Sequence, residues 1–429
     1  MIKIHTLGGY DEIGKNMTAV EIDNEIIVLD MGLYLDNYIK AQDNDPFNNP
    51  TAEELRIAKA IPDDSSINKS KVVAIIPSHA HLDHLGAIPY LEKNYNADIV
   101  CTPFTKALLK IIAKDKHIDL KNKIKAKMKF KTKHTTIEFI PITHSTLQTI
   151  IVAIHTSEGT ILYANDFKVD MTPTFGEKPD LNRLKNLKTL ALICDCIYAK
   201  EDEHTPSESE AKDKLETLFK THNFDKKAII ISTFSSHLAR LQTIIKCAKQ
   251  INRKIIFLGR SLAKYIEAAE NILDLPEDIE IVKYKKEIKR RLKEINKAEY
   301  VIVATGHQGE PNAVLSRIAN NQLSFELEKD DVIIFSSSVI PVEENEKNSE
   351  ILINQLKDKQ VKIFKDVHVS GHAAGKDLKE FIKLTNPKHI FPAHGPYENQ
   401  QHLIKIAKGL DYSDEFLHCC HDGETTTIN

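Results

Sequence analysis

Three histidines and an aspartate fall within six positions of one short segment, SHAHLDHLGAIP. They are His79, His81, Asp83 and His84, and they come directly after the apolar run 72–77. Imidazole nitrogens and carboxylate oxygens are the groups that bind zinc and similar divalent ions. His79 and His81 can point the same way if the backbone between them is extended, and Asp83 suits the first turn of a following helix. The segment therefore predicts a metal site rather than a polar surface turn.

Several other predicted strands also end in a residue that can bind a metal. The runs EIIVLD, IEFIPITH, ILYAND and HIFPAH end in Asp30, His144, Asp166 and His394. Strand ends on a rigid scaffold can hold side chains in place. Each residue alone is more often a turn residue or a cap, but together with HAHLDH they favour one site. Four ligands on one short segment are best shared between two neighbouring ions, and Asp166 is then the candidate for the carboxylate that bridges them.

The composition indicates a globular chain with more than one domain. The chain has 429 residues, of which 41% are hydrophobic and 28% are charged, and this length exceeds that of one ordinary core. No apolar run approaches the roughly 18 residues of a membrane span, and the start MIKIHTLGGYDEIG lacks a signal-peptide pattern. The six cysteines show no disulfide-framework spacing. We therefore expect a cytoplasmic protein with reduced thiols and no membrane partner.

The charge distribution permits a nucleic-acid partner without requiring one. The formal net charge is −3, so RNA would have to be held by local basic patches. Residues 121–134 and 283–297 are strongly basic. A solvated face of a helix or strand is the more usual explanation of such runs.

The order of predicted elements indicates a split domain. Residues 1–204 alternate strand-like runs with turn signals, which is typical of a β-rich sandwich. Residues 205–357 alternate helical patterns with short apolar strands such as KAIIIST and EYVIVATG, which predicts a mostly parallel sheet. Residues 358–429 return to short strands around one helix at 376–384. We therefore predict the α/β class, with an inserted α/β domain inside a β-rich one.

These motifs resemble those of a known family. HAHLDH, PITHS, YANDF and PAHG are similar to the motifs of the metallo-β-lactamase fold, and residues 205–357 resemble the β-CASP insertion. GGYDEIGKNM, STFSSHLARLQ, ATGHQGEP, SSSVIPVEENE and HVSGHA are similar to the ribonuclease J family in particular. The resemblance covers nearly the whole chain and implies an αββα sandwich split by a β-CASP domain. It is closer to the shorter archaeal members than to bacterial ones, which usually carry a further C-terminal domain.

The resemblance also implies a metal centre with two zinc ions, for which manganese is a conceivable substitute. One ion would be bound by His79, His81 and His144, the other by Asp83, His84 and His394, with Asp166 as the bridge and Asp30 as the acidic residue that supports the histidine loop. In the wider superfamily, a histidine at the position that corresponds to His394 accompanies RNA substrates. This favours RNA over DNA.

Two further residues match positions of the β-CASP motifs, Asp195 in ICDCIY and His372 in VSGHA. Two metal ions can activate a shared water and neutralise the charge that develops on a phosphate, but the leaving oxygen still needs a proton. His372 is the candidate general acid, because an imidazole titrates near the operating pH and Asp195 could keep it oriented and protonated. We count Asp83 with the catalytic residues as well as with the ligands.

A 5′-terminal phosphate needs a pocket of its own, and the family uses one to bind the phosphate one nucleotide away from the cut. Hydroxyl and imidazole donors suited to a phosphate are offered by Ser336, Ser337, Ser338, His368 and Ser370. Consecutive serines after a strand are also common in plain turns. His307 in ATGHQGEP stands where the family more usually has serine, and the sequence assigns it no role.

Together these observations predict a zinc-dependent 5′-to-3′ exoribonuclease that prefers 5′-monophosphate ends, acts on single-stranded RNA in RNA decay and maturation, and forms a homodimer. An internal cutter of the β-CASP family is the main alternative. A small-ester hydrolase of the same fold would explain the metal ligands but not the insertion, Asp195 or His372. An RNA-binding subunit with a dead site is disfavoured, because every predicted ligand position holds a competent residue.

Overall fold

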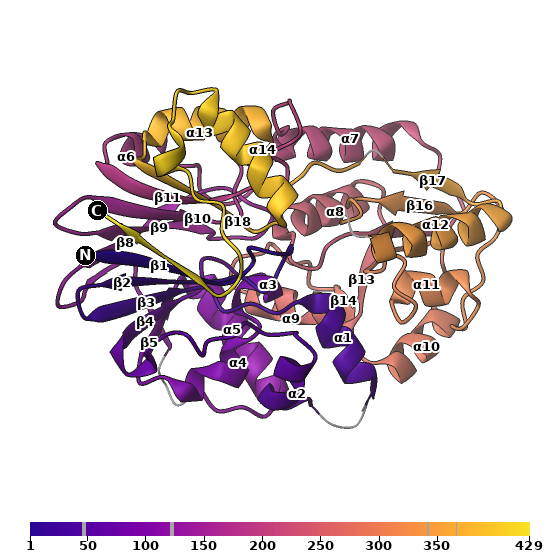
Figure 1. Cartoon of the computed structure of the whole chain (residues 1–429). Helices are drawn as coiled ribbons and strands as arrows, with labels where there is room; N and C mark the ends of the chain where they lie inside the picture. The colour runs from indigo at the N-terminus through magenta and orange to yellow at the C-terminus, as the bar shows by residue number, and fades with distance from the viewer. Residues whose placement is uncertain (45–48, 121–123, 341–342, 366) are drawn as a thin grey trace. The chain divides into compact units, whose positions relative to one another are not determined.

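The computed structural model describes residues 1–44, 49–120, 124–340, 343–365 and 367–429 (Figure 1). The chain forms two compact units. Unit 1 comprises Met1–Met171, Gly176–Thr205 and Gly371–Asn429, and unit 2 comprises Thr172–Phe175 and Pro206–Ser370. Unit 2 thus interrupts the sequence of unit 1. Among the described residues, no helix combines the length and the apolar character that a membrane span requires.

Unit 1 contains two β-sheets. The first sheet runs in the order β19 (Glu424–Ile428), β1 (Ile2–Gly8), β2 (Met17–Ile22), β3 (Glu25–Leu29), β4 (Val72–Ile76), β5 (Asp98–Cys101) and β6 (Ile124–Ala126). The second runs in the order β18 (His389–Ala393), β11 (Thr189–Asp195), β10 (Thr160–Ala164), β9 (Ile150–His155), β8 (Thr136–Pro141) and β7 (Lys129–Lys131). Isoleucine and valine dominate these strands, because β-branched side chains favour extended backbone.

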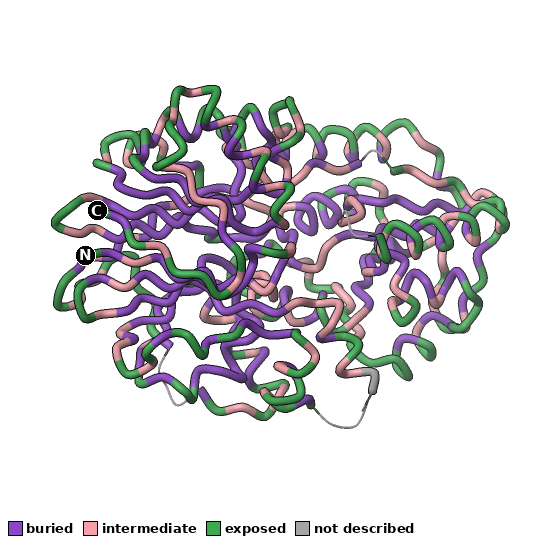
Figure 2. The backbone as a smooth tube through the Cα atoms, in the orientation of Figure 1, coloured by how far each residue is buried: buried purple, intermediate pink, exposed green. Residues whose placement is uncertain are grey.

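The strands of both sheets are mostly buried (Figure 2), and their inner faces share one core. Ile4 and Val20 of the first sheet belong to the same buried cluster as Val152, Tyr163 and Ile193 of the second. Within each strand, the residues that alternate with these face outward, because successive side chains of a strand point to opposite faces of the sheet. On the outer side of the second sheet, Leu192 of β11 packs with Phe381 of α13 and Leu403 of α14.

Helices cover the outer faces of both sheets. The helices of unit 1 are α1 (Leu35–Asn44), α2 (Ala52–Ile57), α3 (Leu82–Leu85), α4 (Ile88–Leu91), α5 (Pro103–Asp115), α6 (Leu181–Lys185), α13 (Gly375–Thr385) and α14 (Tyr397–Lys408), with single 3-10 turns at Lys69–Lys71, Glu92–Asn94 and Asp414–Phe416. Helix α5 lies beside β6 of the first sheet, whereas α6, α13 and α14 lie on the second (Figure 1). These layers confirm the predicted αββα sandwich.

Unit 2 is built on one parallel sheet. Its strands run in the order β14 (Glu280–Val282), β13 (Lys254–Leu258), β15 (Tyr300–Ala304), β12 (Ile229–Ser232), β16 (Val332–Phe335) and β17 (Lys362–Phe364). Every pairing between these neighbours is parallel. The helices of unit 2 are α7 (Glu208–Thr221), α8 (Leu238–Gln250), α9 (Arg260–Ala268), α10 (Lys285–Glu294), α11 (Val314–Ala319) and α12 (Glu343–Asp358). The predicted mostly parallel sheet is therefore confirmed.

The last strand of this sheet lies beyond the boundary that the sequence suggested. The sequence pattern placed residues 358–429 with the β-rich domain, but β17 pairs in parallel with β16, and contacts assign the chain to unit 2 as far as Ser370. Strand β16, helix α12 and strand β17 form one strand–helix–strand crossover. A strand as short as KIF carries no sign of which sheet it will join.

A buried ion pair joins helices α7 and α8 of unit 2. The side chain of Arg240 in α8 is fully buried and donates to both carboxylate oxygens of Glu208, at 2.8 and 2.9 Å. The same guanidinium donates to the carbonyl of Ser336 at 3.0 Å and to that of Val367 at 2.8 Å. Burial opposes the charged form of Glu208, but His237 and Arg240 outweigh it and hold the pKa of Glu208 well below its usual range.

We predict that Glu208→Gln destabilises unit 2 by about 3–5 kcal/mol, because it leaves a buried guanidinium without its carboxylate. Since the pKa of Glu208 is depressed on folding, its stabilisation is complete above the ordinary carboxyl pKa of roughly 4.3 and is lost as the pH falls below that value. Amide hydrogen exchange of β12 and β16 should therefore accelerate in Glu208→Gln at neutral pH, and in the unmodified chain only on acidification. The exposed neighbour Glu210, changed to Gln, is the matched control. Equal exchange in the two variants would contradict this account of the pair.

Candidate metal centre

The strand ends that carry the predicted ligands of unit 1 lie in register. Strands β10, β11 and β18 are parallel, with Ala164 beside Cys194 and Asp195 beside Ala393. Their carboxyl ends therefore form one edge of the second sheet, where Asp166, Asp195 and His394 follow. In the first sheet, Leu29 of β3 lies beside Ile76 of β4, which places Asp30 next to the segment that leads into the histidine loop.

Three of these strand-end residues have a left-handed backbone. The φ angles of Asp30, Asp166 and His394 are 60°, 58° and 60°. Such a conformation costs roughly 1–2 kcal/mol in a residue with a Cβ atom, and it persists only where the surroundings enforce it, often at functional sites. In each case it turns the chain sharply just after a buried strand. The fold therefore tolerates an unfavourable backbone conformation at these three residues, and this conformation positions their side chains.

Four ring and carboxylate atoms form a first donor set. The Nε2 atom of His79 lies 2.9 Å from Nδ1 of His81, which lies 3.2 Å from Nε2 of His144. Both Nε2 atoms lie 3.5 Å from Oδ2 of Asp166. His81 has extended backbone, with φ −89° and ψ 151°, as the shared direction of His79 and His81 requires.

A second donor set uses the other oxygen of the same aspartate. Oδ1 of Asp166 lies 3.1 Å from Nε2 of His84 and 3.2 Å from Nε2 of His394. Oδ2 of Asp83 lies 3.6 Å from each of these two nitrogens. Asp83 occupies the first turn of α3, where the sequence predicted it. Asp166 thus belongs to both sets, one oxygen to each.

The spacing within each set fits a tetrahedral cation. Ligand atoms about 2.0–2.1 Å from a zinc ion lie about 3.3 Å from one another at the corners of a tetrahedron, close to the separations in both sets. Asp166 is 1% exposed, and its Oδ1 atom has no hydrogen-bond partner among the described residues. A buried carboxylate oxygen without a donor is costly, and a cation between it and the facing imidazoles removes that cost. The residues present therefore fit a pair of divalent ions.

Asp30 orients the histidine loop, which is the segment that carries His79, His81 and His84. Its carboxylate accepts hydrogen bonds from the backbone N–H of Ser78 at 2.6 Å, from the Ser78 hydroxyl at 3.0 Å and from Nδ1–H of His84 at 2.7 Å. The hydroxyl of Tyr163 in β10 donates to it at 2.8 Å. With Nδ1 held by Asp30, Nε2 of His84 faces the second donor set. Such outer partners fix the tautomer and ring orientation of metal-binding histidines.

Close backbone packing holds the loop in place. The backbone of Gly32 lies against Asp83, and a Cβ atom on Gly32 would come within 1.6 Å of the Asp83 carbonyl oxygen. The backbone N–H of Met31 donates to the His84 carbonyl at 2.7 Å, and that of Asn16 to the Asp83 carbonyl at 3.0 Å. Only glycine fits at position 32, and outward movement of residues 82–84 would break these hydrogen bonds.

Burial and neighbouring charges set the protonation of the donors. Burial, followed by nearby imidazoles, lowers the pKa of His79 and His144 well below the usual value, so both rings are neutral, the form that binds metals. Burial opposes the charged form of His84, but Asp166, Asp30 and Asp83 outweigh it and raise its pKa. Burial likewise opposes the ionised form of Asp166, whereas His394 and His84 hold its pKa well below the usual range.

Asp195 and His372 form a hydrogen-bonded pair beside the donor sets. Nδ1–H of His372 donates to Oδ2 of Asp195 at 2.7 Å, and Nε2 of His372 lies 3.9 Å from Oδ2 of Asp166. The other oxygen of Asp195 accepts from the backbone N–H of Ile197 at 2.9 Å. Burial opposes the imidazolium form, but the carboxylates of Asp195 and Asp166 raise the pKa of His372 to about 9. The preceding residue, Gly371, accepts from Nδ1–H of His144 at 2.7 Å.

The residues predicted to bind a phosphate all lie in unit 2. The hydroxyl of Ser336 is fully buried and donates to the Val367 carbonyl at 2.9 Å, and that of Ser337 contacts the Ser232 carbonyl at 3.4 Å. These two hydroxyls therefore already have hydrogen-bond partners within the protein. The hydroxyl of Ser338 lies 3.2 Å from Nε2 of His368, and Ser370 follows on the same segment as His368.

The sequence left three supporting residues unassigned. Asn165 donates through its amide to the side-chain oxygen of Asn16 at 3.1 Å and to the Tyr163 hydroxyl at 3.0 Å, and the Asn16 amide lies 3.2 Å from Nε2 of His84. The period of two in ILYAND could have placed Tyr163 and Asn165 on one face. Nothing local marks Asn16, because its partners lie far along the chain.

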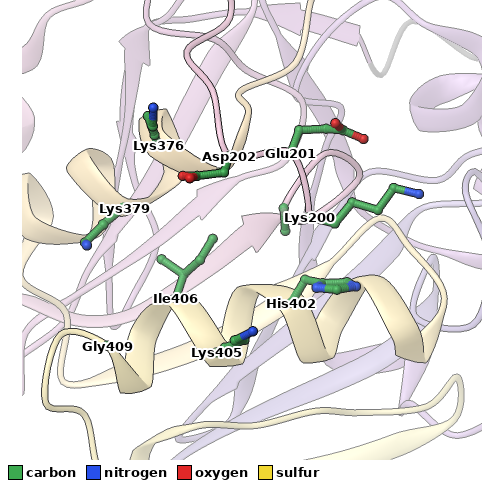
Figure 3. Close-up of a pocket in the computed structure, with 11 residues that line it drawn as sticks. Lys200, Glu201, Asp202, Lys376, Lys379, His402, Lys405, Ile406 and Gly409 are labelled. Carbon is green, nitrogen blue, oxygen red and sulfur yellow. The ribbon is translucent and has the colours of Figure 1, made fainter.

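A separate pocket on unit 1 carries mainly positive side chains (Figure 3). It lies between residues 199–202, the start of α13 and the exposed face of α14. Its charged and titratable side chains are Lys200, Glu201, Asp202, Lys376, Lys379, His402 and Lys405. Lysines outnumber carboxylates, so the pocket suits an anion, but the lysines are exposed. Flexible exposed lysines attract a polyanion without fixing its position.

Comparison with known proteins relates the whole chain to one family. Family models described as metallo-beta-lactamase superfamily, as ribonuclease J beta-CASP domain and as Zn-dependent metallo-hydrolase RNA specificity domain match residues 10–180, 226–356 and 358–412. A ribonuclease J of Pyrococcus abyssi is 40% identical over 424 residues, which cover 96% of this chain and 94% of that protein. A ribonuclease J of Methanocaldococcus jannaschii is 38% identical over 439 residues, 99% of this chain and 98% of that protein.

More distant relatives are also similar over most of the chain. Ribonuclease J2 of Bacillus subtilis is 32% identical over 431 residues, 97% of this chain and 73% of that protein. A crystal structure of a protein of unknown function from Enterococcus faecalis V583 aligns over 100% of both chains with a TM-score of 0.66 at 16% identity. At that identity the likeness concerns the fold alone.

We predict that the chain binds two divalent ions and that Asp166→Ala removes both, because each donor set loses an oxygen. His81→Ala and His394→Ala should each remove about one ion, since each belongs to one set. The metal content is measured by elemental analysis after reconstitution with zinc and removal of free metal. His134→Ala changes an exposed histidine and is the control. Full metal content in folded Asp166→Ala would contradict the shared role of that carboxylate.

Proposed function

Because this chain belongs to the ribonuclease J family, we propose that it is a zinc-dependent exoribonuclease that hydrolyses single-stranded RNA from a 5′-monophosphate end. The chain is a metal-dependent ribonuclease with metallo-β-lactamase and β-CASP domains. The ion, the direction of degradation and the preferred 5′ group are the proposal. The observation that carries it is the convergence of six buried or half-buried side chains on the two oxygens of Asp166.

The donor sets supply the binding site for the ions. His79, His81, His144 and Asp166 would hold one, and Asp83, His84, His394 and Asp166 the other. Five imidazoles among these ligands favour zinc over magnesium or calcium, which prefer oxygen. Manganese would also accept this mixture of nitrogen and oxygen. When bound, two such ions supply an activated water and neutralise the charge on the phosphate that is attacked.

His372 is proposed as the general acid. Asp195 accepts the Nδ1 proton of His372, so the ring is fixed and Nε2 faces the side of Asp166. During hydrolysis, water attacks the phosphorus, the bond to the leaving oxygen breaks, and His372 gives that oxygen the proton from Nε2. Asp195 positions the ring and stabilises its charged form, as a carboxylate does for a catalytic histidine. Asp83, which is half-buried, contributes to the reaction as a ligand.

The 5′ phosphate is proposed to bind in unit 2. Ser338 and His368 offer a hydroxyl and an imidazole within 3.2 Å of each other, and Ser370 lies two positions further along the chain. Ser336 and Ser337 support this place through their bonds to Val367 and Ser232. Neutral donors of this kind bind a terminal phosphate.

We also propose a cytoplasmic location and a homodimeric state for the enzyme. All six cysteines are free thiols, which agrees with a reducing compartment such as the cytoplasm. The homodimer expected from the resemblance stays a prediction. Internal cleavage of RNA is the second candidate function, because the same ligands and the same acid serve an internal phosphodiester equally well.

We predict that the zinc-loaded chain releases labelled mononucleotides from RNA with a 5′ monophosphate. RNAs of one sequence with a 5′ monophosphate, triphosphate or hydroxyl and one internal label are compared. Degradation of the monophosphate form should be at least about tenfold faster, since a hydrogen-bonded charged group contributes roughly 1.5–3 kcal/mol. His372→Gln should slow all three.

Two results would contradict the proposal, and each would indicate a different function. Long discrete fragments that do not depend on the 5′ group would indicate the internal cutter. Binding without cleavage by the metal-loaded chain would indicate a dead site. His134→Ala again provides a control for handling and metal loading.

A further inference from the structure

The pocket on unit 1 is bordered by lysines that have no ionic partner (Figure 3). These lysines are Lys200, Lys376, Lys379 and Lys405. All of their side chains are exposed, and within the residues that the structure describes none of them forms an ion pair or a side-chain hydrogen bond. By contrast, Lys408, which lies further along α14, pairs with Asp414 at 2.6 Å. The pocket therefore presents ammonium groups that the fold itself leaves unpaired.

The carboxylates near these lysines do not cancel their charge. The pocket contains four lysines but only two carboxylates, Glu201 and Asp202. Asp377, in the first turn of α13, binds other groups, because its carboxylate lies 2.7 Å from Nδ1 of His204 and accepts from the backbone N–H of Thr205 at 2.7 Å. The pocket is therefore positive, and a ligand that carries several negative charges complements it.

The walls of the pocket lead away from the metal centre. Residues 199–202 begin four positions after Asp195, and α13 begins three positions after His372. Helix α14 begins three positions after His394. Since each residue adds at most about 3.6 Å to the reach of the backbone, Gly375 at the start of α13 lies within roughly 11 Å of His372. An RNA chain that is bound at the metal centre can therefore extend into this pocket.

Lysine is suited to an RNA backbone that has to move. Its ammonium group is a compact charge on a flexible stem, so it follows a phosphate without fixing the register of the chain. Contacts to phosphates hold a nucleic acid but do not read its bases. An enzyme that removes successive nucleotides shifts its substrate after each cleavage, and such contacts permit that movement.

From these observations we propose that this pocket is an auxiliary RNA site that binds backbone phosphates of the substrate away from the bond that is cut. The inference rests on the proposed function, because the ligand is the single-stranded RNA of that function. The site retains long RNAs of any sequence. It contributes nothing to RNAs that are too short to reach from the metal centre to the pocket.

The test measures how salt weakens the binding of RNA to the zinc-loaded full-length chain. The probe is a single-stranded RNA of about 16 nucleotides with a fluorescent 3′ end and phosphorothioate linkages that resist hydrolysis, and binding is followed by fluorescence anisotropy. Each phosphate contact contributes about 0.7 to the slope of log Kd against log salt concentration. The pocket variant combines Lys376→Gln, Lys379→Gln and Lys405→Gln. Its slope should be smaller by about 2, since three contacts are lost.

Two further variants serve as controls. The α5 variant changes to Gln three lysines of a helix that lies beside the first sheet, whereas α13 and α14 lie on the second; they are Lys106, Lys110 and Lys114. Its slope should equal that of the unmodified chain. The arginine variant combines Lys376→Arg, Lys379→Arg and Lys405→Arg, keeps the charges and should keep the slope. Thermal midpoint and zinc content should be unchanged in all three variants.

Kinetic measurements show where the pocket acts. On RNA of about 16 nucleotides the pocket variant should raise KM severalfold and leave kcat unchanged, whereas on RNA of about four nucleotides neither constant should change. An equal effect on the short RNA would place these lysines at the bond that is cut and would overturn the inference.

The outcomes separate this inference from the proposed function. Equal salt slopes in the pocket variant and the α5 variant overturn the inference and leave the proposed function standing. If only the pocket variant loses slope while the unmodified chain shows no preference for a 5′ monophosphate, the inference stands and the proposed function fails in that part. Because RNA binding is measured without cleavage, the first result does not depend on the second.

Discussion

The buried carboxylate of Asp30 is the interaction on which the metal centre depends. It lies at the end of β3, is fully buried, and accepts from Ser78, His84 and Tyr163. Ser78 belongs to the loop that leaves the first sheet, and Tyr163 belongs to β10 of the second. One side chain therefore joins both layers of the sandwich to the histidine loop. Without it, several buried donors would lose their acceptor, at roughly 1–3 kcal/mol each.

The architecture converts this local order into a two-part donor set. The parallel strands β10, β11 and β18 end at one edge, so their following residues meet although they are far apart in sequence. Left-handed backbone at Asp166 and His394 turns both side chains into that edge. The resulting group of imidazoles and carboxylates is buried and strained when considered alone. A pair of bound cations would offset both costs, which is why the arrangement has the form of a binding site and not of a core.

Much of this could be predicted from the sequence, because the relevant signals are local. Strands ending in Asp or His, and the HAHLDH segment, pointed to the residues that the fold brings together in the two donor sets, and the alternation of strands and helices predicted the parallel sheet. The supporting contacts could not be predicted in this way. Asn16 meets His84, and Gly371 meets His144, only after the chain has folded.

The second unit illustrates the same limit. Consecutive serines suggested a phosphate site, but only the folded chain places the hydroxyls of Ser336 and Ser337 against Val367 and Ser232. The three-residue strand β17 joined a sheet that its own residues could not identify. Likewise, the resemblance marked His307 as a departure from the family pattern, whereas only the folded chain shows that its ring is buried against Phe234.

The most direct test of the central claim is anomalous X-ray diffraction at the zinc edge from crystals of the zinc-reconstituted chain. Two peaks are expected, one on each side of the Asp166 carboxylate, with His79, His81 and His144 around one and Asp83, His84 and His394 around the other. A single peak, or peaks away from Asp166, would contradict it.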